Sequence, residues 1–413
     1  MTKGEGGSDP QVSDGMNMQR YLGNKGLVGF IALMNMLIPL SIDMYLPALP
    51  GMNAYFGSSS AITNLTLSAF FLFYAVGILF WGPLSDKYGR KKILLVGGIV
   101  YLLSSIACAL SFNIYFLIAA RIFQGIGSGG ITSVSIAIIK DCFAGKKRGA
   151  ILAISQSVSG LAPMLAPVVG GIILRFTNWQ GTFWALAAIA AINLVLIFLF
   201  EETLKEEDKY TGTVMGSLGR LLIVGKNKSF MIPAGIFSLC ALPFMGYIAV
   251  SSYIYVDYFG LSAQEYSYFF AANALVSICG PFLYVRVFMV LNKKVFAASM
   301  LGISAISGIL VMTIGTLTPI LFWASFALMS LSVSITRPFS TALLLDQHVS
   351  DTGAVSSLIN TMFTVLGSVG MSVVTLMPGN IITVLGVLIA VFSVIPFIGW
   401  IAFMKSSIPC KGV

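Results

Sequence analysis

Twelve apolar stretches, each about as long as a helix that crosses a bilayer, follow one another through the chain. In hydrocarbon every backbone N–H and C=O needs a partner inside the protein, and a continuous helix supplies it. The composition agrees, because 57% of the residues are hydrophobic and only 9% are charged. The sequence therefore predicts an all-α membrane protein with twelve transmembrane helices. The expected helices cover residues 27–49, 61–83, 93–111, 114–139, 148–175, 180–200, 229–255, 265–290, 295–316, 319–343, 353–377 and 381–404.

Basic residues gather in the junctions on one side of these helices. Lysines and arginines occupy 86–92, 140–148, 205–228 and 286–294 as well as both ends of the chain, whereas the opposite junctions hold one basic residue, Arg175. Because loops that keep positive charge stay in the cytoplasm, both termini are expected there. The same placement accounts for the net charge of +9 and argues against a nucleic-acid partner.

The longest polar stretch, residues 201–228, divides the helices into two sets of six. A weak repeat supports a duplication, since GPLSDKYGRKK after the second helix and GPFLYVRVFMVLNKK after the eighth both run from Gly-Pro to a basic turn. We expect two pseudo-symmetric six-helix bundles, a recurrent transporter plan. The predicted units are a cytoplasmic tail (1–26), a first bundle (27–200), a cytoplasmic linker (201–228), a second bundle (229–404) and a second tail (405–413).

The string PLSIDMYLPALP, residues 39–50, places a carboxylate inside the first expected helix. Asp43 has Pro39 before it and Pro47 after it, and each proline removes a backbone hydrogen bond from a helix. A charge and a loosened backbone are costly in lipid unless they face a cavity. Asp43 is therefore predicted to face one.

An arginine, Arg121, lies inside the fourth expected helix. Such a residue costs at least ~2.5–3.5 kcal/mol on insertion scales unless it finds partners. Counted at 1.5 Å per residue, Asp43 and Arg121 both lie roughly 9–11 Å below the outer boundary. The two side chains can therefore meet directly or through water, or each can face a polar cavity separately.

The junction after the second helix carries the most specific string in the chain, GPLSDKYGRKK. It resembles the signature loop of the major facilitator superfamily, G-x-x-x-D-x-x-G-R-[RK]. The resemblance implies that the acid in this loop meets the start of the eleventh helix, near Asp351. The matching residues are Gly82, Asp86, Gly89, Arg90 and Lys91.

The fourth helix contains LIAARIFQGIGSGG, residues 117–130. Its glycines match G-x-G-x-x-G, but no strand precedes them, so a dinucleotide site does not fit. Glycines in a membrane helix instead allow close packing. The string also resembles the superfamily's fourth-helix motif, R-x-x-Q-G-x-G, with Arg121 and Gln124 at its polar positions.

The fifth helix resembles the antiporter motif of drug exporters, G…GPxxGG, although Ala166 replaces the first Gly of its GP pair. Prolines and a glycine pair in one helix predict a bend and a close helix crossing. The residues concerned are Gly160, Pro163, Pro167, Gly170 and Gly171.

SIDMYLPALP in the first helix, together with RFTNWQGTFW at 175–184, narrows the resemblance to the Bcr/CflA-type multidrug/proton antiporters. The resemblance implies a transporter in the bacterial cytoplasmic (inner) membrane that exports amphipathic drugs in exchange for protons. It implies no cofactor, and as partners only drugs, protons and the lipid bilayer, with a monomeric chain. Some related antiporters carry a second acid in the first helix, where this chain has Asn35. The proton-coupling residues would then be Asp43 and Arg121.

A drug pocket would draw on polar and aromatic side chains within the helices, although most membrane aromatics simply pack or anchor. Arg337 in the tenth helix either extends to the cytoplasmic surface or lines the pathway. The pocket candidates are Asn35, Tyr45, Tyr74, Gln124, Gln156, Tyr247, Tyr253, Phe269, Asn273 and Asn360.

Two other function classes stay open at this point. A facilitator, symporter or exporter of a metabolite would keep the fold without the antiport chemistry. A membrane-embedded enzyme fits poorly, because the sequence lacks H-E-x-x-H, G-x-S-x-G and Walker strings and has a single histidine. The five cysteines follow no zinc or disulfide spacing, so no metal site is expected.

Overall fold

The computed structural model of the chain describes residues 19–143, 145–209, 223–288, 291–347 and 352–411. The side chains of 145–150 and 152–160 fall outside this description, and with them the predicted site residues Gln156 and Gly160. Asp351, near which Asp86 was expected to bind, also lies outside it. Across the described ranges the secondary structure is helical, without strands.

The first six spans form the first bundle. The first span consists of α1 (Gly23–Asp43), the short 3-10 helix η1 (Leu46–Ala48) and α2 (Leu49–Phe56). The others are α3 (Ser60–Tyr88), α4 (Arg90–Ala109), α5 (Ile114–Cys142), α6 (Gly145–Phe176) and α7 (Trp179–Leu199).

The second bundle follows a linker that contains the 3-10 turn η2 (Glu206–Asp208). Its first span is built from α9 (Lys228–Ser238), α10 (Ala241–Ser252) and a π-helical end, η3 (Tyr253–Tyr258). The next spans are α11 (Ala263–Leu283) with η4 (Tyr284–Phe288), and α12 (Lys293–Thr313) with η5 (Ile314–Thr316). The last three are α13 (Pro319–Leu345), α14 (Thr352–Leu376) and α15 (Ile381–Lys405).

The expected helices are confirmed, most of them to within a few residues. Within the described residues, eleven helical segments are long and apolar enough to cross a membrane, and α6 adds a shorter apolar stretch, Leu161–Phe176. The first span differs from its prediction, because it breaks after Asp43 and continues to Phe56 rather than ending at residue 49. Prolines explain the restart, since Pro47 and Pro50 occupy the first turns of η1 and α2, where a missing N–H costs nothing.

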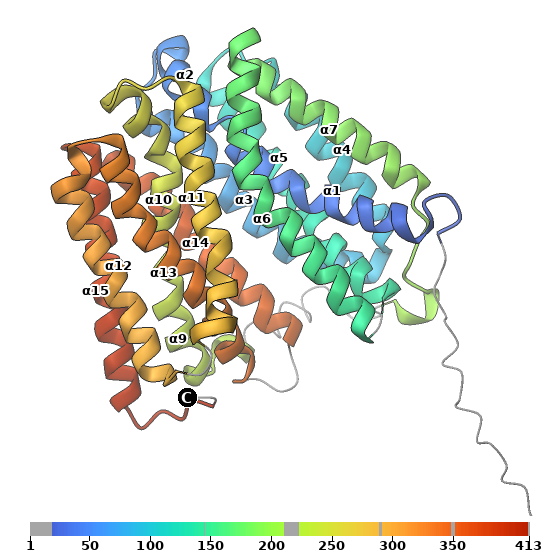
Figure 1. The fold of residues 1–413 in the computed structure, drawn as a ribbon. Helices are drawn as coiled ribbons and strands as arrows, with labels where there is room; N and C mark the ends of the chain where they lie inside the picture. Colours follow the sequence, from blue (N-terminus) through green and yellow to red (C-terminus); the bar gives the residue numbers. More distant parts are fainter. Residues whose placement is uncertain (1–18, 144, 210–222, 289–290, 348–351, 412–413) are drawn as a thin grey trace, which may run out of the picture.

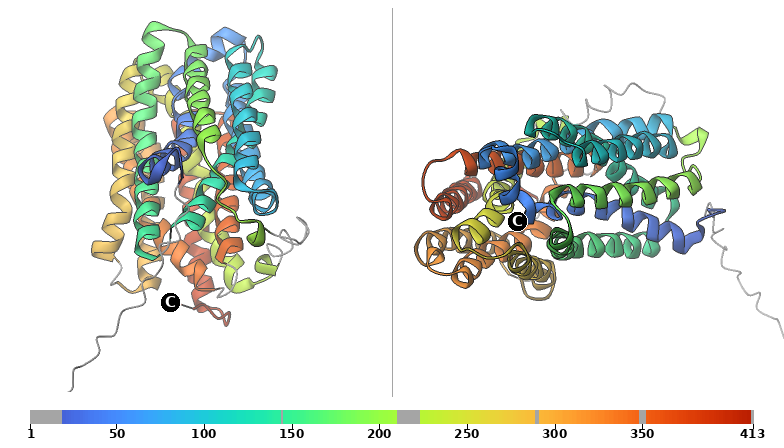
Figure 2. Two further views of the ribbon diagram at one scale, coloured as in Figure 1. Left: turned by 90° about the vertical axis from the view of Figure 1, so that its right-hand side faces the viewer. Right: turned by 90° about the horizontal axis from the view of Figure 1, so that it is seen from above.

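The two bundles lie side by side and are inclined to each other (Figure 1). In the first, α5 packs between α3 and α4, and α7 covers α4; in the second, α12 packs against α13 and α15, and α10 against α14. The view from above separates the blue-to-green bundle from the yellow-to-red one (Figure 2). Between them, α6 packs on α11 and α3 on α14. The residue limits predicted for the two bundles and the linker stay predictions.

Hydrogen bonds join the bundles on the side away from the basic junctions. Ser267 Oγ donates to the carbonyl of Pro167 at 2.7 Å, and Ser368 Oγ to the carbonyl of Ser68 at 2.8 Å. Tyr253 Oη donates to a side chain of α2, Asn53 Oδ1, at 3.4 Å. We call this side, with α2 and the start of α11, the closed end, and the other the basic end.

Candidate functional site

The helical hydrogen bonding of α1 ends at Met44, whose N–H donates to the carbonyl of Leu40 at 3.2 Å. Tyr45 already lies outside α1, and the next backbone bond, from the N–H of Ala48 to the carbonyl of Tyr45, belongs to η1. Pro47 has no N–H with which to continue the helix. The last carbonyls of α1, such as that of Ser41, are therefore open to a donor from elsewhere in the bundle.

Arg121 of α5 supplies that donor. It is fully buried and donates to the carbonyls of Ser41 at 3.0 Å and Thr66 at 3.1 Å. It also donates to Gln124 Oε1 at 2.6 Å and to Tyr45 Oη at 3.4 Å. The carbonyls at a helix C-terminus carry partial negative charge. The guanidinium is thus balanced by a helix end and by neutral oxygens instead of a carboxylate.

Aromatic rings and an amide complete the surroundings of this arginine. Its guanidinium carbon lies 4.2 Å from the centre of the Phe70 ring and 4.7 Å from that of Tyr45. The amide of Gln124 donates onward to Ser105 Oγ at 2.8 Å. Stacking on ring faces favours a cation in a place without water. Arg121 and Gln124 therefore act together as a buried brace that ties α5 to α1, α3 and α4.

Asp43 lies two residues after Ser41, whose carbonyl accepts from Arg121. The side chains of Asp43 and Arg121 nevertheless form no ion pair. The carboxyl is 4% exposed and has neither a hydrogen bond nor an ion pair with any described residue. Directly after Asp43, η1 packs against α10 and α11 of the second bundle, where Tyr266 Oη and Ser251 Oγ share a hydrogen bond of 2.9 Å. Asp43 thus lies at the contact between the bundles, and the direct Asp43–Arg121 pair allowed by the depth argument is absent.

The glycines of α6 bring this helix against the break in the first span. A Cβ on Gly170 would overlap the carbonyl oxygen of Met44, directly after Asp43. A Cβ on Gly171 would lie 2.9 Å from Ser267 Oγ of α11. The close helix crossing expected from this motif is therefore confirmed. A bend in α6 was also predicted and stays a prediction. The helix continues without interruption past Pro163 and Pro167.

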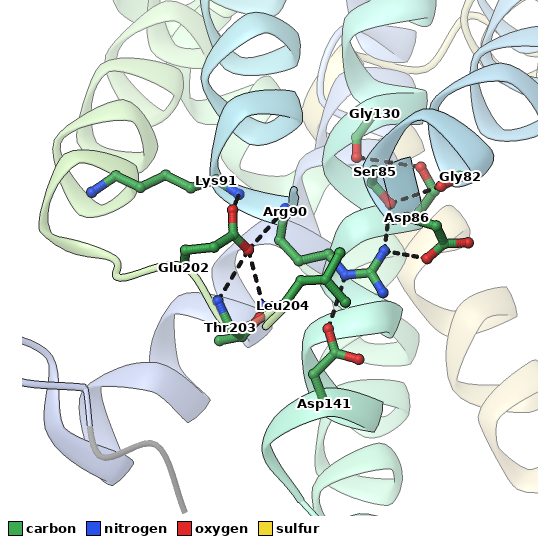
Figure 3. A network of polar contacts seen from close by, with 11 residues as sticks. Gly82, Ser85, Asp86, Arg90, Lys91, Gly130, Asp141, Glu202, Thr203 and Leu204 are labelled. Atoms are coloured by element: carbon green, nitrogen blue, oxygen red, sulfur yellow. Dashed lines mark hydrogen bonds and ion pairs between the residues drawn. The ribbon is translucent and has the colours of Figure 1, made fainter. Parts of the chain in front are cut away.

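The loop between α3 and α4 holds a network of charges at the basic end (Figure 3). Arg90 donates from Nε to Asp141 Oδ2 at 2.8 Å and from Nη1 to Asp86 Oδ1 at 2.5 Å. The same Nη1 reaches Ser85 Oγ at 2.7 Å, and that hydroxyl donates to the carbonyl of Gly82. Three helices, α3, α4 and α5, are joined through one guanidinium.

Glu202, just after α7, binds the other side of this loop. Its carboxylate accepts the backbone N–H of Arg90 at 2.9 Å and that of Lys91 at 3.0 Å, at the start of α4 (Figure 3). An anion at a helix N-terminus is stabilised by the free N–H groups there. Gly89 precedes them at φ 102°, and a Cβ on it would meet the Glu202 carboxylate. Glu202 therefore fixes the position of α4 relative to α7.

Asp141 and Glu202 are not among the predicted site residues, and a different partner was expected for Asp86. In the described residues Asp86 pairs with Arg90, while the expected partner region at Asp351 lies outside them. The available signal was modest: both missed acids stand beside basic junctions, at the ends of predicted helices. An acid in such a place has basic neighbours within reach only after the helices have packed.

The predicted pocket residues do not gather at one place. Tyr45, Tyr247 and Tyr253 are buried, and the Tyr247 ring stacks on another aromatic ring 3.7 Å away. Asn35 Oδ1 accepts from Ser135, and Gln124 belongs to the brace around Arg121. Tyr74 and Phe269 are half-buried, Asn273 is buried, and Asn360 is exposed. Their roles in binding a substrate stay predictions.

Two helical bundles joined at one end, with a buried acid at the junction and a charged network opposite, define a membrane transporter rather than an enzyme. The sequence profile of the Major Facilitator Superfamily matches residues 31–371. The chain therefore belongs to this family.

Named relatives lie within the same family. An uncharacterized MFS-type transporter, YdgK of Bacillus subtilis, is 31% identical over 357 residues, which cover 83% of this chain and 86% of that one. A bicyclomycin resistance protein homolog of Haemophilus influenzae is 27% identical, covering 67% and 70%. The multidrug resistance protein MdtL of Klebsiella pneumoniae is 27% identical, covering 65% and 70%.

Solved structures show the same fold at low sequence identity. A bacterial homolog of the human lysosomal transporter Spinster, in an inward-facing and occupied conformation, matches with a TM-score of 0.73 at 14% identity, covering 92% of this chain and 97% of that one. A D-xylose-proton symporter matches with a TM-score of 0.71 at 16% identity, covering 93% and 98%.

Proposed function

We propose that this transporter exports amphipathic small molecules, drugs among them, across the bacterial cytoplasmic membrane in exchange for protons. The proposal rests on Asp43, a buried carboxyl at the contact between the bundles that has no ion pair with any residue the structure describes. An ionisable group in a membrane-spanning segment is costly, so its presence there points to a role in transport. Relatives named for bicyclomycin and multidrug resistance support the cargo class.

The proposed cycle uses the two ends in turn. With the basic end in the cytoplasm, the described conformation is closed to the outside, and cargo enters from the basic end. Cargo binding and loss of the Asp43 proton are coupled in this state. Opening at the closed end separates Ser267 from Pro167 and Ser368 from Ser68, and exposes Asp43 to external protons. Reprotonation then favours release, because a ligand or proton shifts the equilibrium only by binding the two states differently.

Within this proposal Arg121 keeps the first bundle rigid and positions the helix end that carries Asp43. The Asp86–Arg90–Asp141 network holds α3, α4 and α5 together while the bundles move. The chain works as a monomer with both termini in the cytoplasm, and the proton gradient supplies the energy without a cofactor.

Proton release from purified protein tests this function. Adding a cargo drug to protein in weakly buffered detergent solution should release protons, and Asp43→Asn should abolish the release. Asp257→Asn, which neutralises an exposed acid at the closed end, is the matched control and should release protons normally. Unchanged release from Asp43→Asn would show that the coupling group lies elsewhere, and no release from wild type would favour a uniporter of a metabolite.

A further inference from the structure

A second arginine, Arg337 of α13, lies inside the membrane-spanning region of the second bundle. It stands eight residues before the end of α13, about 12 Å from the basic end. It lines a recess of about 40 Å³ between α9, α12, α13 and α14, and its side chain is exposed. The other walls of the recess include Phe237 and Phe363.

The guanidinium stays at this depth instead of reaching the surface of the membrane. Its carbon lies 3.9 Å from the centre of the Phe363 ring, and Nη2 donates to Asn360 Oδ1 at 3.5 Å. Counted from the start of α14 at the basic end, Asn360 is about 12 Å deep and Phe363 about 16 Å. The Cα–Cβ bonds of α13 also tilt toward its N-terminus, away from the basic end. The expected alternative, extension to the cytoplasmic surface, is not what the structure shows.

Arg337 has no acidic partner among the described residues. The recess around it is lined by uncharged side chains, apolar ones and hydroxyls such as those of Ser304, Ser332 and Thr336. A guanidinium has five N–H donors, and the structure uses one of them here, at a long distance. The other arginine, Arg121, donates to four oxygens. Within the described part of the chain, Arg337 thus keeps an unpaired charge and N–H donors without acceptors.

A free guanidinium stacked on an aromatic ring is suited to a planar anion. Its fork of N–H groups matches the two oxygens of a carboxylate, and such charge-assisted pairs are the strong ones. We propose that Arg337 binds the carboxylate of the transported molecule, so that the cargo includes aromatic or apolar organic acids. Asn360 and Phe363 hold the guanidinium in place for that contact. The identification of the bound molecule as cargo rests on the proposed export function.

The test is equilibrium dialysis of the purified full-length protein, at neutral pH, with radiolabelled 2-naphthoate and with 2-naphthamide, its uncharged analogue. Wild type should bind the carboxylate about tenfold tighter or more, since the charged hydrogen bonds are lost with the amide. Arg337→Gln should remove this preference without changing naphthamide binding, and Arg337→Lys should retain part of it. Arg286→Gln removes the same charge from the exposed η4 and should keep the full preference.

Equal binding of the two probes by wild type would overturn the proposal, whatever the variants do. Persistence of the preference in Arg337→Gln, or its equal loss in Arg286→Gln, would also overturn it, because the effect would then come from elsewhere or from overall charge. Dialysis needs no proton gradient. Failure of proton-coupled export would therefore leave the binding result intact, and loss of the carboxylate preference would leave drug-driven proton release intact.

Discussion

Arg121 donates to the carbonyl of Ser41 at 3.0 Å, at the point where α1 runs out of backbone partners. The arginine on α5 thereby completes the end of α1, while Asp43, two residues further on, pairs with no cation among the described residues. Arg121 and Asp43, whose matching depths suggest an ion pair, thus have separate roles in the structure.

Arg121→Gln should destabilise the protein severely. The shorter side chain leaves the carbonyls of Ser41 and Thr66 buried without donors, and each such group costs about 1–3 kcal/mol. The measurement is the thermal unfolding midpoint in detergent. Arg121→Lys keeps the positive charge but has a single donor group, so its unfolding midpoint should lie between those of wild type and Arg121→Gln. A midpoint for Arg121→Gln equal to that of wild type would contradict the role of Arg121 as a brace.

Asp43→Asn should leave the unfolding midpoint unchanged or raise it. The carboxyl makes no ion pair or hydrogen bond with the described residues, and an amide of the same size removes a buried ionisable group. The same thermal unfolding experiment checks this, with Arg121→Gln as the destabilised reference. A drop as large as that of the arginine variant would mean that Asp43 is structural.

Gly89→Ala should cost about 1–3 kcal/mol, because φ of 102° is strained for any residue with a Cβ. Its Cβ would also meet the Glu202 carboxylate. A double-mutant cycle with Glu202→Ala separates the two causes: the second change should recover only the part due to the collision. Full additivity of the two substitutions in unfolding experiments would argue against the contact.

A short bis(methanethiosulfonate), which forms one disulfide to each cysteine and releases methanesulfinate, should link Ser68→Cys to Ser368→Cys, since Ser368 Oγ lies 2.8 Å from the Ser68 carbonyl. The two cysteines are introduced into a chain whose native cysteines have been replaced. After proteolytic cleavage in the polypeptide linker between the bundles, cross-linked protein is recognised on a gel because its two halves migrate together. Linking should stop transport until the bridge is reduced. Transport at the full rate by fully linked protein would show that the closed end does not open.

Gly170→Ala should lower the yield of that cross-link. The added Cβ overlaps the Met44 carbonyl in the described conformation, so the closed end is disfavoured relative to a state in which α6 and the first span separate. Gly51→Ala, where a Cβ meets nothing within 4 Å, is the control and should cross-link as the parent does. Equal yields in the two variants would contradict this account.

Hydropathy predicted the helices because membrane thickness fixes how long an apolar stretch must be, and that constraint acts on each segment alone. The end of the first span was less predictable, because Pro47 and Pro50 restart helical turns after the break instead of ending the span. The motifs indicated which residues matter at Asp86 and Gly170. Their partners, Asp141, Glu202 and the Met44 carbonyl, come from other segments, and spacing along one helix carries no information about them.

The hydroxyls that join the bundles at Ser267 and Ser368 bind main-chain oxygens, not side chains. Every residue of a helix carries such an oxygen, so the acceptor side of these bonds places little demand on the amino acid found there. Substitutions at Ser68 or Pro167 that preserve the helix can therefore leave these hydrogen bonds in place, while loss of the hydroxyl on α11 or on α14 removes the bond that it makes. Where the bundles meet, the sequence of the first bundle, which supplies the carbonyls, is therefore free to evolve faster than that of the second, which supplies the hydroxyls.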